Sequence, residues 1–547
     1  MFQGRREIVK HHEMIQALLS PHLYPDRPQR VEFRQTHISS LFFTDHYVYK
    51  VKKPVNFGFL DFSTLEARRF YCQEEVRLNR RLAPQVYLGV ATIREKDGHL
   101  SWDGEGRVID YAVVMRRLPA EKMLERLLEA GQVSADDWQR LAAYLAAFHQ
   151  RAEQNAEITR YGACDVIRED WQENFAQTKR YVGETLTEET YHYIQQQVER
   201  FLMQRQGIFA WRQQTGRIRD CHGDLRVDHI CLEPEIAVFD CIEFNKRFRY
   251  TDVAAEVAFL YMDLEARGFA DAARLFLHHY LVASQDQGLP ALLDFYACYR
   301  AYVRGKVKSF LLDDPEVSEE EKAEARRQAT AYFTLARRYA ERLRFPLLLI
   351  TCGLTGTGKT TMARLLAGHL SLVLLRSDVL RKELAALPPA VHRYEEYGEG
   401  IYSESFTDQT YAALYREAER YLVQGESVIL DASFLRRARR EEARKLAERL
   451  GAAFYVIECV CPEGMVKERL EKRQREGRDA SDGRWELFSQ QKQVAEPVTE
   501  IAAEHHIRLD TTQPPAVLLT TVLQHLAGRE GRGAVSEKEG VKHVHPS

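Results

Sequence analysis

The chain has 547 residues, 45% hydrophobic and 29% charged, and this ordinary globular composition argues against a mainly disordered, collagen-like or low-complexity protein. Its 77 basic and 80 acidic residues leave a formal net charge of −3, which argues against a chain-wide basic surface for nucleic acid. Nine scattered cysteines, no signal-peptide pattern and no apolar run of the roughly 18–20 residues that a membrane span needs predict a cytoplasmic protein with reduced thiols and no membrane partner.

The first part of the chain has the pattern of strands followed by a helix. Residues 38–43 and 47–53 flank a short polar turn, which predicts a β-hairpin. A helix is expected over residues 63–81, because Ser63 and Glu66 form a capping-box pattern at its start.

A second strand pair and a long helical region are expected next. The strands are predicted over residues 88–93 and 108–115, with Asp103-Gly104 in the turn between them. Residues 120–310 are helical in pattern, apart from a strand–loop–strand segment over 217–245 that holds most of the unusual polar residues.

From residue 345 the chain alternates apolar strand-like runs with helical stretches, which predicts a parallel α/β sheet. A charged helix, with Ser318 and Glu321 as its capping box, is expected to precede this region. The predicted organisation is a first domain over 1–312 with lobes at 30–118 and 119–312, a helical connector over 313–344, a second domain over 345–525 and a disordered tail over 526–547.

The strongest motif is a phosphate-binding loop. Residues 353–360 read GLTGTGKT and fit GxxxxGK[ST] at every fixed position, after a strand-like run and before a helix-like one. Glycines let backbone N–H groups surround phosphates, Lys359 can reach the β- and γ-phosphates, and the Thr360 hydroxyl can ligate Mg²⁺. The predicted ATP-binding residues of this loop are Gly353, Thr355, Gly356, Thr357, Gly358, Lys359, Thr360 and Thr361.

Two carboxylates downstream suit the same chemistry. Asp431 ends an apolar strand-like run, where a carboxylate can meet Mg²⁺; the alternative is a carboxylate that caps a turn. Asp378 follows Ser377 at another strand end and could deprotonate an acceptor hydroxyl. A simple helix N-cap explains the Ser-Asp pair equally well.

Two groups of arginines have both a functional and a structural interpretation. Arg469 and Arg473 share a helix face, and with Arg478 they could close over the transferring phosphoryl group; a solvated helix face is the alternative. The basic run at 436–440 could contact an anionic acceptor or nucleic acid, although a solvated helix start is favoured.

Residues 345–525 resemble the small P-loop kinases of the adenylate-kinase-like group, which includes polynucleotide-kinase, gluconate-kinase, zeta-toxin and chloramphenicol-phosphotransferase relatives. The likeness rests on GLTGTGKT, SDVLRK, LDASF and the arginine-bearing helix at 467–478. It implies that Asp378 positions or deprotonates the acceptor. It also implies that Arg473, together with Arg469 and Arg478, stabilises the transferred charge.

The first half holds a second constellation of carboxylates. Asp224 follows His222-Gly223 in a loop, and Asp240 ends a strand-like run further on. One carboxylate could orient or deprotonate a hydroxyl while the other holds Mg²⁺ on the phosphates. Without further context, Asp224 could equally be a turn residue and Asp240 a strand-end cap.

This half resembles the aminoglycoside-phosphotransferase branch of the protein-kinase-like fold over residues 30–310. The resemblance makes Asp224 the catalytic residue, Asp240 the metal ligand and Asp252 a structural anchor of the loop. It assigns the phosphate-binding lysine to Lys50, with Lys52 as the alternate. Its helix partner is Glu75 rather than Glu74, because Leu78 and Leu82 then give Glu75 a buried helix face.

Three features depart from that family. His229 stands where an Asn metal ligand is usual, no Gly-rich loop precedes the Lys50 strand, and Cys-Ile-Glu follows Asp240. Histidine is a poorer Mg²⁺ ligand than an oxygen donor, so this half could use Mn²⁺ or bind ATP without transferring phosphate.

The whole chain resembles bacterial proteins that fuse a bilobal aminoglycoside-phosphotransferase-like domain to a C-terminal P-loop α/β kinase domain. The main hypothesis is therefore an ATP-dependent kinase that phosphorylates a small-molecule hydroxyl. A nucleotide-responsive regulatory or scaffold protein and a nucleic-acid 5′-hydroxyl kinase are the alternatives. No motif identifies the acceptor, the preference for ATP over GTP, the oligomeric state or any coupling between the two sites.

Overall fold

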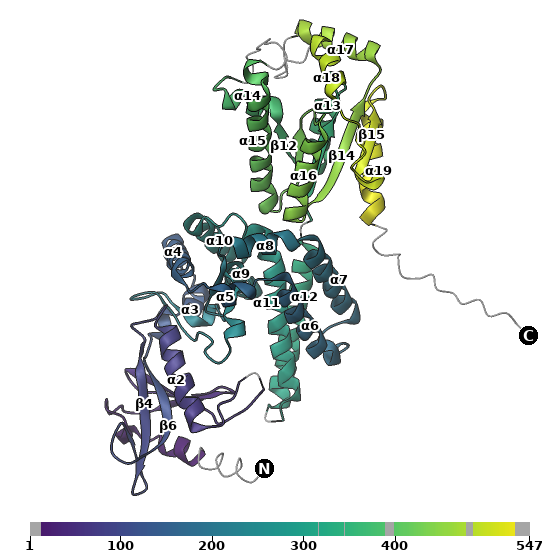
Figure 1. The fold of residues 1–547 in the computed structure, drawn as a ribbon. Helices are drawn as coiled ribbons and strands as arrows, with labels where there is room; N and C mark the ends of the chain where they lie inside the picture. The colour runs from purple at the N-terminus through teal and green to yellow at the C-terminus, as the bar shows by residue number, and fades with distance from the viewer. Residues whose placement is uncertain are drawn as a thin grey trace, which may run out of the picture. The chain divides into compact units, whose positions relative to one another are not determined.

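The computed structural model describes residues 12–58, 60–315, 317–343, 345–388, 399–476 and 485–530. The chain divides into two compact units (Figure 1). Met1–Glu199 and Arg212–Leu343 form the first unit, and Arg200–Trp211 and Arg344–Ser547 form the second. The predicted fold class is confirmed, because a strand lobe and a helical lobe build the first unit and a parallel sheet builds the second.

The strand lobe is a six-stranded antiparallel sheet of order β1-β2-β3-β6-β4-β5. Its strands are β1 (Glu32–Gln35), β2 (Ser39–Phe43), β3 (Tyr47–Lys52), β4 (Tyr87–Lys96), β5 (His99–Trp102) and β6 (Arg107–Arg116). The predicted hairpin is confirmed as β2 and β3, with Ser40 opposite Val51. β3 lies between β2 and β6, so its lysines are not on a solvated edge strand.

Two local predictions in this lobe are wrong. Helix α2 (Leu65–Asn79) is capped by Thr64, whose hydroxyl accepts the Ala67 N–H, and not by Ser63. The chain also forms β5 between the two predicted strands, so β4 turns at Asp97-Gly98 rather than at Asp103-Gly104. Both residues of that tight turn have positive φ, which Asp and Gly tolerate and which the strand twist favours.

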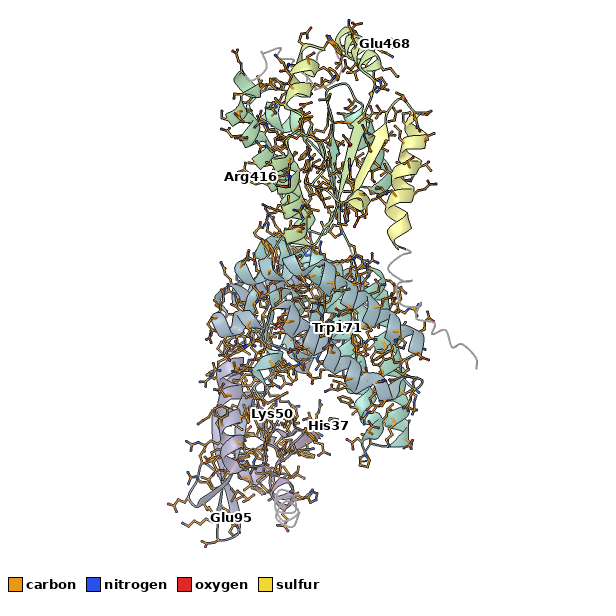
Figure 2. All side chains as sticks on the ribbon, turned by 45° about the vertical axis from the view of Figure 1, so that its right-hand side comes forward. His37, Lys50, Glu95, Trp171, Arg416 and Glu468 are labelled. Atoms are coloured by element: carbon orange, nitrogen blue, oxygen red, sulfur yellow. The ribbon has the colours of Figure 1, made fainter. Side chains whose placement is uncertain are left out.

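The helical lobe contains most of the helices of the first unit. They are α3 (Leu124–Glu129), α4 (Ala135–Arg151), α5 (Ala156–Arg160), α6 (Cys164–Thr178), α7 (Glu188–Gln204), α8 (Gln206–Gln214), α9 (Val253–Ala266), α10 (Ala270–Ser284), α11 (Pro290–Phe310) and α12 (Glu319–Glu341), of which α7 and α8 belong to this unit in part. Trp171 of α6 is buried, with its ring 5.2 Å from that of Tyr299 on α11 (Figure 2). The capping box at Ser318 is confirmed, and α12, from the segment predicted as a connector, packs along α11 in the first unit.

Two short strand pairs frame the loop that carries Asp224. β7 (Ile218–Asp220) pairs with β10 (Tyr250–Asp252), and β8 (Ile230–Cys231) pairs with β9 (Ala237–Val238). The Asp224 loop leaves β7, and Asp240 follows β9 directly. The pairing therefore brings the two carboxylate-bearing segments to the same end of the helical lobe.

The second unit is a five-stranded parallel sheet of order β12-β13-β11-β14-β15, with apolar cores on both faces. Its elements are β11 (Leu347–Cys352), α13 (Lys359–Leu370), β12 (Val373–Arg376), α14 (Ser377–Leu384), α15 (Glu404–Val423), β13 (Val428–Asp431), α16 (Arg437–Leu450), β14 (Ala453–Val460), α17 (Glu463–Glu476), α18 (Trp485–Val494), β15 (His506–Asp510) and α19 (Pro515–Glu530). Helices α15 and α16 cover one face, and α13 and α19 cover the other. The predicted alternation of strands and helices is confirmed.

All nine cysteines lie in the described part of the chain, and each is a free thiol. Within the same described residues, no helix is both long and apolar enough to cross a membrane.

Candidate active sites

The phosphate-binding loop joins β11 to α13 at the centre of the parallel sheet. Gly356 has φ +77°, and a Cβ there would lie 2.8 Å from a Val466 methyl carbon, so only glycine fits. The Thr357 hydroxyl donates to the Leu354 carbonyl at 2.8 Å, which closes the turn. The loop ends at the N-terminus of α13, where free N–H groups and the helix dipole favour phosphate.

Lys359 points back into this loop. Its buried ammonium donates to the Leu354 carbonyl at 2.7 Å. Burial lowers the pKa of Lys359, while Asp431 and Asp378 oppose that shift. Both carboxylates predicted from the sequence therefore lie within electrostatic range of the loop lysine.

Adjacent strand ends position those carboxylates. Asp431 ends β13, where it accepts a hydrogen bond from Arg376 Nε at 3.3 Å. Asp378 lies in the first turn of α14, directly after β12, and the Ser377 hydroxyl donates to the Asp431 carbonyl at 3.1 Å. Because β12, β13 and β11 are neighbours and parallel, their carboxyl ends meet at one edge. The residues present therefore fit ATP with Mg²⁺.

The predicted lid arginines are only partly described. Arg469 donates to the Thr511 carbonyl at 2.7 Å, and the Thr511 hydroxyl donates to the Thr357 carbonyl at 2.8 Å, so Arg469 supports the loop. The Arg473 side chain and Arg478 lie outside the described residues. No sequence signal linked Arg469 to Thr511, because 42 residues separate them.

The arginines of the 436–440 run are engaged in ion pairs. Arg436 pairs with Glu404 at 2.6 Å, Arg437 with Glu441 at 2.7 Å, Arg439 with Asp408, and the fully buried Arg440 with Glu500 at 2.5 Å. These pairings argue against a basic patch for nucleic acid at this position.

In the first unit, two buried lysines share one glutamate. Lys50 Nζ lies 2.9 Å from one Glu75 carboxylate oxygen, and Lys52 Nζ lies 2.6 Å from the other. Lys50 also donates to Asp240 at 2.6 Å, and Lys52 pairs with Glu243. Figure 2 shows Lys50 at the end of the strand lobe that adjoins the helical lobe. Glu74 pairs with Arg77 instead.

The lysines and carboxylates of this cluster stabilise one another in their charged forms. Burial by itself would lower the pKa of Lys50, but Asp240 and Glu75 outweigh it and raise that pKa well above its usual value. Burial raises the pKa of Glu243, and Lys52 opposes the shift. The Asp240 side chain is 45% exposed, against 0% for Glu75 and 5% for Glu243. Asp240 is therefore the member of the cluster that can reach a metal ion.

The Asp224 side chain and backbone interact with Arg226 and His229 of the same loop. Arg226 donates to the Asp224 carboxylate and to His229 Nε2, at 2.9 Å and 3.0 Å. Arginine only donates, so His229 Nε2 accepts, and its Nδ1–H donates to the Asp224 carbonyl at 2.9 Å. His229 Nε2 is 3.7 Å from Asp240. Burial raises the pKa of Asp224, but Arg226 and His229 together hold it below its usual value.

The described residues contain no cluster of three or more His, Cys, Asp or Glu side chains arranged around one metal position. A metal here would use Asp240 and His229 Nε2, together with phosphate oxygens from ATP. It would also have to displace the Arg226 hydrogen bond to His229. Because histidine is a poorer Mg²⁺ ligand than an oxygen donor, this pair of one carboxylate and one imidazole suits Mn²⁺ better than Mg²⁺.

The loop anchor is Glu256 rather than Asp252. The buried Glu256 carboxylate of α9 accepts the backbone N–H groups of His222 and Gly223, at 2.8 Å and 3.0 Å. Asp252 instead caps α9 and binds Arg212 at 2.8 Å. Gly223 has φ +87°, and a Cβ would lie 2.9 Å from a carbonyl oxygen, so the loop requires glycine there.

We expect Glu256→Ala to loosen this loop. The two N–H groups would lose their acceptor, which costs about 2–3 kcal/mol for a buried charged partner. Hydrogen exchange of the peptide that spans His222 and Gly223 should accelerate, and the thermal midpoint of the first unit should fall. Glu105→Ala, at an exposed position of the same unit, is the matched control. Equal exchange in both variants would contradict the anchoring role.

His222 makes the first unit sensitive to acid. Burial, aided by His229, lowers the pKa of His222 to about 3. In the unfolded chain the His222 side chain takes up its proton near pH 6.5. Between about pH 6.5 and 3 the unfolded state therefore binds more protons than the folded state. Acidification through this range lowers the free energy of unfolding by about 1.4 kcal/mol per pH unit. Thermal unfolding from pH 7 to 5 should show a smaller slope for His222→Gln than for the exposed-site control His22→Gln. Equal slopes would refute this assignment.

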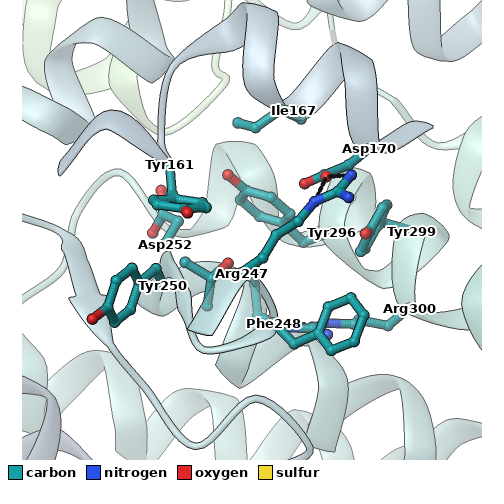
Figure 3. A pocket seen from close by; sticks show the side chains of 12 residues that line it. Tyr161, Ile167, Asp170, Arg247, Phe248, Tyr250, Asp252, Tyr296, Tyr299 and Arg300 are labelled. Carbon is teal, nitrogen blue, oxygen red and sulfur yellow. Dashed lines mark hydrogen bonds and ion pairs between the residues drawn. The ribbon is translucent and has the colours of Figure 1, made fainter. Parts of the chain in front are cut away.

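A pocket lies beside the Asp224 loop (Figure 3). Arg247 crosses it to donate to Asp170 at 2.8 Å, and Arg300 in its wall also donates to the Gly223 carbonyl at 3.4 Å. The lining residues are Tyr161, Ile167, Asp170, Arg247, Phe248, Tyr250, Thr251, Asp252, Ala255, Tyr296, Tyr299 and Arg300. Sequence reasoning missed this pocket because its walls come from separate segments with no shared motif.

Comparisons with known proteins match both units. The model of the phosphotransferase enzyme family matches residues 60–296, and that of an AAA domain matches residues 348–498. A gluconokinase from Sinorhizobium meliloti 1021 is 19% identical, with a TM-score of 0.26, over 36% of this chain and 99% of that chain. An APS kinase from Mycobacterium tuberculosis is 18% identical, with a TM-score of 0.26, over 34% and 98%.

Uncharacterized proteins of Mycobacterium tuberculosis and Mycobacterium bovis are each 33% identical to this chain over 452 residues, or 82% of this chain and 88% of theirs. The two family models, with the GLTGTGKT loop in the second unit, make the chain an ATP-dependent phosphotransferase. The chain therefore belongs to the family of these mycobacterial proteins, as a fusion of an aminoglycoside-phosphotransferase-like domain with a P-loop kinase domain.

Proposed function

We propose that the second unit transfers the γ-phosphoryl group of ATP to a hydroxyl of a small molecule. One observation carries this proposal: neighbouring parallel strands β12, β13 and β11 bring Asp378, Asp431 and the phosphate-binding loop to one sheet edge. That edge of an α/β sheet is where ligands bind.

Each residue has a role that follows from its position. Lys359 and the loop N–H groups bind the β- and γ-phosphates, and Thr360 and Asp431 hold Mg²⁺, which neutralises phosphate charge when bound. Asp378 accepts the proton of the acceptor hydroxyl. We assign Arg473 to the lid that closes over the transferred group. The chain would work in the cytoplasm, where ATP is supplied.

We propose a second phosphotransfer site in the first unit. Lys50, held by Glu75, would bind ATP phosphates, Asp240 and His229 would hold Mg²⁺ or Mn²⁺, and Asp224 would accept the acceptor proton. The shared Lys50–Glu75–Asp240 contacts support this assignment, because they place the lysine beside the candidate metal ligand.

A nucleotide-responsive regulatory module is the second candidate for this unit. The observation that favours it is the hydrogen bond of Arg226 to the Asp224 carboxylate at 2.9 Å, which occupies an oxygen that a base would use. Single-turnover transfer from γ-labelled ATP with the Lys359→Met chain separates the two candidates. A labelled small molecule supports a second active site, and ATP binding without label supports regulation.

A further inference from the structure

Three basic side chains of α11 follow one another at four-residue spacing. Arg300, Arg304 and Lys308 therefore share one face of the helix, and we call this set the α11 basic row. Arg300 donates to the Gly223 carbonyl at 3.4 Å, which fixes this face beside the Asp224 loop. Arg304, one turn further on, lies within electrostatic range of Asp224.

Arg304 and Lys308 lie within electrostatic range of acidic side chains, but neither forms a hydrogen bond or an ion pair with one among the described residues. The Arg304 guanidinium lies 5.7 Å from the centroid of the Tyr332 ring. The Arg304 Nε atom is buried and has no hydrogen-bond acceptor. Burial, with repulsion from Arg304 and Arg226, lowers the pKa of Lys308. Within the described part of the chain, the buried Arg304 Nε therefore has no acceptor.

The nearby carboxylates are already bound to other cations. Asp224 and Asp228 each accept a hydrogen bond from Arg226 at 2.9 Å. Glu324 accepts one from Arg327 at 3.0 Å. These acids lie within electrostatic range of Arg304 or Lys308, but each forms its hydrogen bonds with another arginine. The N–H donors of Arg304 and Lys308 are therefore available to a ligand.

We propose that Arg304 and Lys308 bind an anionic group, a carboxylate or a phosphate, of the molecule that presents its hydroxyl to Asp224. This inference rests on the proposed phosphotransfer function of the first unit and names its acceptor class. A guanidinium donates two parallel N–H bonds to such an oxyanion, and a lysine adds a point charge. Binding would satisfy the buried Nε and relieve the repulsion between the two side chains.

The ATP phosphates are the competing ligand for these cations. Lys50, the candidate phosphate-binding lysine, pairs with Asp240 and Glu75. Arg304 and Lys308 instead lie within electrostatic range of Asp224 and Asp228. The position of Arg304 and Lys308 therefore fits an anionic group of the acceptor better than the phosphates of ATP. The two ligands can be distinguished by experiment.

The test measures how fast Lys308 is acetylated in the full-length chain, by mass spectrometry of its peptide. Inorganic phosphate and malonate serve as separate probes for the two anion types, with sodium chloride at equal ionic strength as the control. We expect at least one anion to slow acetylation about threefold at twice its dissociation constant. The exposed Lys179 should react at an unchanged rate.

Arg304→Gln should remove this protection, and Arg304→Lys should keep part of it. A thermal midpoint close to that of wild type shows that each variant is still folded. Equal Lys308 acetylation with and without both anions would overturn the proposal. Protection that survives Arg304→Gln, or that a non-hydrolysable ATP analogue gives and neither anion does, would overturn it as well. The readout needs no catalysis, so its failure is distinct from a failure of phosphotransfer at Asp224.

Discussion

Lys359→Met is expected to reduce phosphate transfer by the second unit about 100-fold or more. The lysine ammonium is the one side-chain cation seated inside the described loop, and removal of a single preorganised donor to a transition state costs about 10²–10³ in rate. Methionine keeps the length and apolar contacts of the stem, so the loop should still form. Transfer from γ-labelled ATP at saturating Mg²⁺ measures the loss.

The matched control for this change is Lys445→Met, which alters an exposed lysine of α16 in the same unit. Its transfer rate should equal that of wild type. If Lys359→Met and the double variant Asp224→Asn, Lys359→Met both retain full ATP turnover, neither site is the catalyst and the proposed function fails.

Asp224→Asn should have the second large effect, on any product made by the first unit. Asparagine has nearly the same shape and can still accept a hydrogen bond from Arg226, but it cannot take a proton from an acceptor hydroxyl. The rate of that product should fall about 100-fold or more, within the range that general-base catalysis contributes. The assay uses Lys359→Met as the background, so that only first-unit transfer is measured.

Asp136→Asn, at an exposed position of α4, controls for the change of charge. A product that forms equally well in Asp224→Asn and in this control would show that Asp224 is not the base. ATP binding without any product in the Lys359→Met background would favour the regulatory interpretation of this unit.

Much of the second unit could be predicted from the sequence, because its signals are local. GLTGTGKT contains the loop, its lysine and its hydroxyl in one stretch, and an apolar run that ends in Asp431 marks the adjacent strand. Parallel strands then place these segments at the same sheet edge without any further information. The partners of Arg469 could not be predicted, because Thr511 comes from a different strand end.

In the first unit, single candidate site residues could be predicted from the sequence, but most of the residues that they pair with could not. Alternation along β3 put Lys50 and Lys52 on one face, and both do approach Glu75. In the sequence, the Cys-Ile-Glu that follows Asp240 is only a departure from the family pattern, whereas in the structure its Glu243 pairs with Lys52. Lys52 and Glu243 belong together, because a second buried lysine requires a second carboxylate to balance its charge.

The loop anchor shows why such pairings escape sequence reasoning. Asp252 and Glu256 are one helical turn apart, and either could reach the Asp224 loop. The buried Arg212 binds Asp252 and leaves Glu256 to accept the loop N–H groups. Arg212 comes from α8, far from any motif, so only the folded arrangement decides between the two acids.

The most direct test of the central claim is transfer of label from γ-labelled ATP into a metabolite extract by the full-length chain, with Mg²⁺ and then with Mn²⁺. The account predicts a labelled small molecule that wild type forms and Lys359→Met does not. A total absence of labelled small molecules with wild type, under both metals, would contradict it.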